Sequence, residues 1–231
     1  MFIYFFSFIF AVLSVCLTIY IMGYTNKQIA ALSEEEILDY NKESWAIKKY
    51  NRTKITYIGV ALLFIASLIC GYTICNSVTS VIAGIEITIC YYVILSAAII
   101  DFRIKRIPNL LSVILIVSRL LILVYEIFFI EEVVAYLVSS LIGCFLSGLM
   151  LIFANRLSKG GIGAGDIKLL SCLGLMCGLY VVFSTLLIAL VFCILASLFL
   201  LIMKKSGKKE QIPFGPFIYF GYLIMCIFTL Y

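Results

Sequence analysis

The sequence predicts an all-α fold, a polytopic membrane helical bundle of about eight transmembrane helices, and both composition and hydrophobic pattern indicate it. The chain has 231 residues, of which 65% are hydrophobic and 13% charged, and its mean hydropathy is +1.20. An average soluble domain is about 45–50% apolar and about 25% charged. So apolar a chain cannot cover itself in water, which excludes a soluble globular enzyme, a disordered tail and a free nucleic-acid-binding protein. Long continuous apolar runs also argue against a β-barrel, whose strands alternate apolar and polar residues.

Continuous apolar runs predict the individual spans, because a hydrocarbon core about 30 Å thick needs about 20 apolar residues as helix. The runs cover residues 2–24, 55–75, 78–100, 109–130, 133–154, 167–203 and 217–231. The run 167–203 is too long for one crossing at about 1.5 Å per residue. Gly174 and Gly178 predict a break near residue 178, which gives a short sixth span, a full seventh span and a short eighth span at the end. A tight turn at Cys75-Asn76-Ser77 is expected to join the second and third spans.

The first apolar run differs from a cleaved signal peptide. It has no basic start, it is too long for the apolar region of a signal peptide, and it lacks a small-x-small exit. We therefore expect residues 1–24 to be a retained first span.

Basic residues orient the bundle. Of the 17 lysines and arginines, all but Arg119 lie in or beside four polar segments, residues 25–54, 101–108, 155–166 and 204–216. With eight spans, these segments all fall on one side of the membrane. Because positively charged segments remain in the cytoplasm, this side is predicted to be cytoplasmic, with the N-terminus and the C-terminus outside.

The segment 25–54 is expected to be cytoplasmic and to contain an interfacial helix over residues 34–50. Ser33 and Glu36 fit a capping box at its start, and Trp45 would lie near the lipid headgroups. A partner-binding role of this segment is the alternative.

Two aspartates are the main candidates for chemistry, because ionisable residues at the edge of a span are costly to bury. Asp101 follows the third span and Asp166 opens the sixth, so both are predicted at one depth on the basic side. Two carboxylates that share a site cannot both ionise easily, so one keeps a proton. The ionised one can then take a proton from water while the other polarises a carbonyl, which is the chemistry of an aspartic protease. The alternative is that each Asp only caps a helix or faces headgroups.

Residues for other kinds of chemistry are missing or scattered. The chain has no histidine, which excludes an imidazole base or a His-ligated metal. Its nine cysteines lie in or beside apolar runs and form no CxxC pair, so we interpret them as small buried apolar side chains. We expect no metal and no cofactor, since zinc needs clustered thiolates.

The neighbours of the aspartates favour a built site. Four glycines precede Asp166 in residues 160–165, and glycine lets an extended peptide approach the backbone closely. A phosphate-binding loop is the rival interpretation, but the GK[ST] ending is absent. Pro108 is well placed to start the fourth span, and residues 213–216 form a rigid Pro-Phe-Gly-Pro turn into the eighth.

These three segments resemble the signatures of the type IV prepilin peptidases, which are membrane-embedded GxGD aspartic proteases. The matching segments are DxRxxxIPN at residues 101–109, GxGDxKL at residues 163–169 and PFGP at residues 213–216. The resemblance covers residues 78–231 and implies that Asp101 and Asp166 are the catalytic pair. It also implies cleavage of prepilin-like or pseudopilin precursors at the cytoplasmic face of a prokaryotic cell membrane, within a membrane peptidase core at residues 55–231. Loop and substrate-binding roles are expected for Arg103, Pro108, Asn109, Gly163, Gly165, Lys168, Pro213, Phe214, Gly215 and Pro216.

The chain departs from the longer family members in its first polar segment. Those members carry a cytoplasmic domain with two CxxC pairs there, and this domain accompanies N-methylation of the new pilin terminus. Here residues 25–54 contain no cysteine. We therefore expect a peptidase without methylation.

Three further charged residues lie inside the spans. Arg119 is about ten residues into the fourth span, or about 15 Å deep, and Glu86 and Glu126 lie on the outer side of that depth. Because intramembrane charges usually pair, we predict a structural ion pair between Arg119 and one of the glutamates, with snorkelling towards lipid as the alternative.

Two other functions remain open at this stage. In an ion- or proton-coupled transporter, the two aspartates would be ion sites, although transporters place such groups near the membrane midplane and often show internal repeats. In a non-catalytic assembly scaffold of a secretion system, the glycines beside Asp166 would have no explanation. In each reading the lipid bilayer is a partner and nucleic acid is not.

Overall fold

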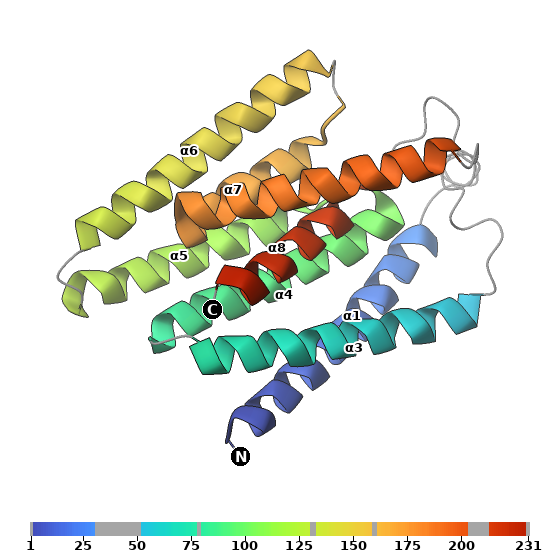
Figure 1. Ribbon diagram of the computed structural model, residues 1–231, viewed down its shortest axis with the longest axis horizontal. Helices are drawn as coiled ribbons and strands as arrows, with labels where there is room; N and C mark the ends of the chain where they lie inside the picture. Colours follow the sequence, from blue (N-terminus) through green and yellow to red (C-terminus); the bar gives the residue numbers. More distant parts are fainter. Residues whose placement is uncertain are drawn as a thin grey trace.

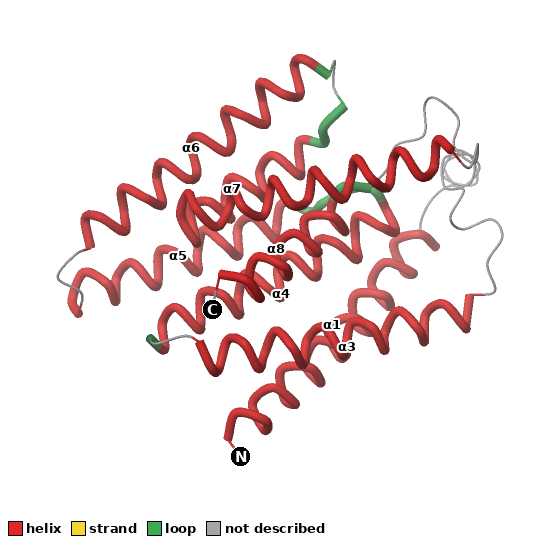
Figure 2. Tube along the Cα trace, in the orientation of Figure 1, coloured by secondary structure: helices red, strands yellow, loops and turns green. Residues whose placement is uncertain are grey.

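The computed structural model describes residues 2–30, 52–77, 80–129, 133–158, 161–202 and 213–229. The predicted interfacial helix over residues 34–50 and the basic residues of the segment 204–209 lie outside the described residues. Every regular element in the described part is a helix, and the described loops between helices are short (Figure 2). The helices are α1 (Phe2–Ala30), α3 (Arg52–Ser77), α4 (Val81–Ile104), α5 (Asn109–Phe129), α6 (Val133–Leu157), α7 (Ala164–Ile202) and α8 (Gly215–Thr229).

The helices have the length and apolar character of membrane spans. Five described helices, α1, α4, α5, α6 and α7, are long and apolar enough to cross a membrane, and α3 and α8 contribute shorter apolar stretches. Large apolar side chains such as Leu121 and Phe128 of α5 are exposed on the outside of the bundle. Such a surface suits contact with lipid. The all-helical class is confirmed; eight crossings and the orientation of the termini stay predictions.

Some helix ends differ from the expected boundaries. α1 continues to Ala30, beyond the predicted end at residue 24. α3 continues through Ser77, so the turn predicted at Cys75-Asn76-Ser77 is wrong, because these residues complete the last turn of the helix. The residue that caps the next helix is Ser80, whose side chain accepts a hydrogen bond from the Ala83 N–H at 3.2 Å.

The break predicted near residue 178 is confirmed. Gly178 lies inside α7 with φ 79° and ψ −178°, a left-handed backbone that glycine adopts without strain. In Figure 1 the chain of α7 reverses its direction at this point, and the deeper orange half runs back across the view. α7 therefore contains two helical segments, residues 164–177 and 179–202.

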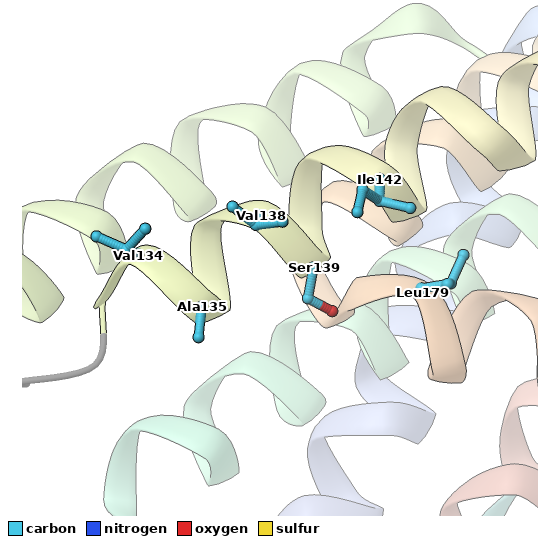
Figure 3. Close-up of a pocket in the computed structure, with 6 residues that line it drawn as sticks. All are labelled: Val134, Ala135, Val138, Ser139, Ile142 and Leu179. Atoms are coloured by element: carbon cyan, nitrogen blue, oxygen red, sulfur yellow. The ribbon is translucent and has the colours of Figure 1, made fainter.

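Small residues let α6 pack closely against the break. A Cβ on Gly143 of α6 would lie 2.7 Å from the Gly174 carbonyl oxygen, and one on Gly178 would lie 2.8 Å from Ser139 Oγ. Figure 3 shows Ser139 and Leu179 beside an apolar groove of about 710 Å³ along α6. Close backbone approach through small residues is the usual way in which helices pack in lipid.

Three buried hydroxyl groups are paired across helices. The Tyr91 hydroxyl of α4 lies 2.6 Å from Ser67 Oγ of α3 and 3.0 Å from the Tyr219 hydroxyl of α8. This chain of hydrogen bonds joins three helices in the interior. Since lipid offers no alternative partner, such bonds fix how the helices sit.

The predicted intramembrane ion pair is confirmed and includes both glutamates. Arg119 Nη1 of α5 lies 2.9 Å from Glu86 Oε1 of α4 and 2.9 Å from Glu126 Oε1 of α5. Arg119 and Glu126 are buried. The cluster ties α5 to α4 and keeps the charges away from lipid.

Candidate active site

Asp101 lies in the last turn of α4, where the helix is about to end. Its side chain is buried, and the residue is only 6% exposed. The helix ends at Lys105, which has a left-handed backbone with φ 55° and donates its N–H to the Asp101 carbonyl oxygen at 2.9 Å. The carboxylate of Asp101 is therefore held at the end of a rigid element.

The start of α8 meets this carboxylate. The Gly215 N–H donates a hydrogen bond to Asp101 Oδ2 at 2.7 Å. A Cβ at position 215 would lie 2.8 Å from Asp101 Cβ and 3.0 Å from Asp101 Oδ2, so only glycine fits here. The first N–H groups of a helix have no partner within it and carry the positive end of its dipole, which suits a carboxylate acceptor.

Asp166 lies in the first turn of α7 and is 8% exposed. Its N–H and that of Ile167 both donate to the Gly163 carbonyl oxygen, at 3.1 and 3.3 Å. The side chain folds back over Gly163, because a Cβ there would lie 2.9 Å from Asp166 Oδ2. Asp166 Oδ1 is buried and has no hydrogen-bond partner in the structure.

The two carboxylates belong to one site. They are close enough for the charge of Asp101 to act on Asp166, although the residues come from different helices. Gly165, at the start of α7, contacts the loop between α4 and α5. A Cβ on Gly165 would lie 3.0 Å from Ile107 Cβ, so this close approach requires glycine. The site thus unites the end of α4, the start of α7 and the start of α8.

The remaining predicted site residues surround the pair. Lys168 Nζ donates to Asn109 Oδ1 at 3.2 Å, which links α7 to the start of α5. Arg103 points elsewhere, because its Nη1 donates to Thr25 Oγ1 of α1 at 3.3 Å. Pro108 precedes α5 by one residue instead of starting it, and its carbonyl accepts the Leu111 N–H at 3.2 Å.

The Pro-Phe-Gly-Pro segment contacts the candidate site directly, which the sequence did not predict. Pro213 and Phe214 are half-buried and precede α8, while Pro216 lies in its first turn. The Phe214 carbonyl accepts the N–H groups of Phe217 and Ile218, at 3.0 and 3.2 Å. The sequence predicts a rigid turn here but not the Gly215 bond to Asp101. The available signal was a glycine N–H at a helix start directly before Pro216, which has no N–H to donate.

Among the described residues, no group of three or more His, Cys, Asp or Glu side chains is arranged to hold a metal ion. The two carboxylates of the described site can exchange protons with water and a substrate. A carboxyl pair can supply both a base and an acid for this purpose.

A bundle of apolar helices with a buried carboxylate pair at its helix ends defines a membrane protein with an acidic site. Residues 88–198, just under half of the chain, match the sequence model of the type IV leader peptidase family. The matched segment contains Asp101, the loop before α5 and Asp166, so this part of the chain is similar to the type IV leader peptidases. Neither the search of curated proteins nor the search of solved structures gave a match.

Proposed function

We propose that the protein is a membrane-embedded aspartic endopeptidase that removes the leader peptide of type IV prepilin-like precursors at the cytoplasmic membrane face. The observation that carries the proposal is the convergence of Asp101 and Asp166, which are far apart in the sequence, both buried and close enough to interact. The match to the leader peptidase family supports the proteolytic class.

In peptide hydrolysis, one carboxyl group would act as the base and the other as the acid. The ionised one takes a proton from water, and the water oxygen attacks the scissile carbonyl. The protonated one donates its proton to the carbonyl oxygen. When the tetrahedral intermediate collapses, the C–N bond breaks, and the carboxyl that took the proton from water gives it to the leaving amine. The other carboxylate takes a proton back from a hydroxyl of the intermediate, which restores the starting state.

Hydrogen bonding suggests which carboxylate starts with the proton. Asp101 Oδ2 already accepts the Gly215 N–H, whereas Asp166 Oδ1 has no partner. We therefore assign the shared proton to Asp166 Oδ1 and the activation of water to Asp101. An oxygen without a donor is free to present a proton to the substrate carbonyl.

The basic residues support the position of the site relative to the membrane. Arg103, Lys105 and Arg106 lie at the same helix ends as the carboxylates, and Lys168 is half a turn beyond Asp166. Positively charged segments remain on the cytoplasmic side, where the leader of a precursor is accessible before its apolar helix. The direct test is cleavage of a prepilin-like substrate in membranes by Asp101→Asn and Asp166→Asn variants.

A further inference from the structure

Four cysteines gather in the interior of the bundle, one from each of four helices. Cys70 of α3, Cys90 of α4 and Cys226 of α8 are buried, and Cys177 of α7 is half-buried. From the sequence, all nine cysteines are expected to be small buried apolar side chains. The structure instead brings Cys90 Sγ and Cys177 Sγ to 3.3 Å.

The thiol pair lies on the same two helices as the two aspartates. Cys90 precedes Asp101 by eleven residues on α4, and Cys177 follows Asp166 by eleven residues on α7. At 1.5 Å per residue, each thiol is about 16 Å along its helix from the carboxylate. The Cys90–Cys177 contact is thus a second point, deeper in the membrane, at which α4 meets the first segment of α7.

A cavity reaches Cys177, whose sulfur lies 3.3 Å from that of Cys90. It has a volume of about 160 Å³, and its wall includes Cys177, Val181, Tyr222 and Met225. Water takes about 30 Å³ per molecule, so the cavity has room for a small solute. Cys177 is the last residue before Gly178, whose backbone is not helical.

We propose that Cys90 and Cys177 form an oxidisable pair that a membrane-soluble two-electron oxidant, such as a quinone, converts to a disulfide between α4 and α7. The two S–H bonds break and one S–S bond forms. Two protons and two electrons pass to the quinone, which becomes a hydroquinone. The sulfur atoms need to approach from 3.3 Å to about 2.05 Å, a shift smaller than the diameter of one atom.

The disulfide would fix the separation of the two helices that carry Asp101 and Asp166. Other buried cysteines, such as Cys172 in the same segment of α7, pack as small apolar side chains. Cys70 of α3 and Cys226 of α8 also contact each other across a helix pair. What distinguishes Cys90 and Cys177 is that their contact joins α4 and α7, the helices that carry Asp101 and Asp166. The proposal does not depend on the peptidase function.

The test uses the full chain in membranes and benzoquinone as the oxidant. After treatment, remaining thiols are alkylated under denaturing conditions, and peptides are mapped by mass spectrometry. We expect a linked peptide pair that contains Cys90 and Cys177, lacks two hydrogens and disappears on reduction. Both thiols should be lost from the alkylated pool in equal measure.

Single variants separate this pair from general oxidation. In Cys90→Ala, the thiol of Cys177 should stay open to alkylation, and the reverse should hold in Cys177→Ala. Cys193→Ala, on the second segment of α7, is the matched control and should leave the linked peptide unchanged. If the unaltered chain loses other thiols without forming this link, or links Cys70 to Cys226 instead, the proposal is overturned, and this result needs no variant to fold.

Discussion

The N–H of Gly215 lies 2.7 Å from Oδ2 of Asp101, so the first turn of α8 holds the carboxylate at the end of α4. This bond connects a segment outside the family match, residues 213–216, to an aspartate inside it. It also explains why a glycine is needed between Phe214 and Pro216. The position must offer an N–H and must have no side chain.

Gly215→Ala should impair cleavage far more than folding. The added Cβ would lie 2.8 Å from Asp101 Cβ and would push the carboxylate aside. A displacement of about 1 Å in a catalytic group can cost about 100-fold in rate, and we expect a loss of that order in cleavage per molecule in the membrane. Gly23→Ala is the control, because a Cβ at that position meets nothing within 4 Å. Equal cleavage activities of the two variants would contradict a role of Gly215 in positioning Asp101.

Replacement of Arg119 should destabilise the protein without touching the chemistry. In Arg119→Gln, Glu86 and Glu126 lose their shared cationic partner. Removing one member of a buried ion pair typically costs about 3–5 kcal/mol, so the amount of folded protein and its thermal stability in detergent should fall. Cleavage per folded molecule should stay near normal. Arg106→Gln, at an exposed position, should leave stability unchanged.

Labelling of introduced cysteines tests the orientation. A cysteine at position 207, in the basic segment before α8, should react with a membrane-impermeant maleimide only after the cells are made permeable. Ser80 lies between α3 and α4, at the end of α4 that is opposite to Asp101. A cysteine introduced there should react in intact cells. If the two positions exchange their behaviour, the bundle is inverted and the site faces outside.

The processed substrate should carry a free terminal amine. Residues 25–54 contain no cysteine, unlike the paired cysteines that accompany methylation in longer family members. Mass spectrometry of a pilin processed by this protein alone should therefore show no added methyl group. A methylated terminus would mean that another part of the chain supports that activity.

Local sequence patterns predicted the features that depend on local physics. The apolar run at residues 167–203 exceeds the thickness of a membrane, and only a glycine accepts the backbone of residue 178, so the break was predictable. The pairing of Arg119 was predictable because an unpaired charge in lipid is costly. In contrast, Asn76 and Ser77 suggested a turn, yet polar residues are tolerated in the last turn of α3.

Contacts between distant helices could not be predicted from one sequence. Gly215 and Asp101 are 114 residues apart, and their spacing says nothing about which helix ends meet. The shared depth of the two aspartates stays a prediction from the span count, and the contact of Asp101 with α8 could not be read from it. The gathering of Cys90 and Cys177 has the same origin, because each is an unremarkable apolar position on its own helix.

Cleavage by aspartate variants tests the central claim most directly. Asp101→Asn and Asp166→Asn keep the size and shape of the side chain but remove its ability to exchange a proton. Each is expected to abolish cleavage while the protein still inserts into the membrane. Asp101→Glu and Asp166→Glu should also be poor, because the added methylene moves the oxygens by roughly 1 Å, which can cost about 100-fold.

The measurement is cleavage of a prepilin-like substrate in membranes, with each variant normalised to its amount there. Glu126→Gln is the control: Glu126 is buried like the aspartates but pairs with Arg119, so cleavage per molecule should stay near normal. The account predicts no cleavage by either Asn variant beside an active control. Substantial cleavage by Asp101→Asn or by Asp166→Asn would contradict the carboxylate pair and, with it, the proposed function.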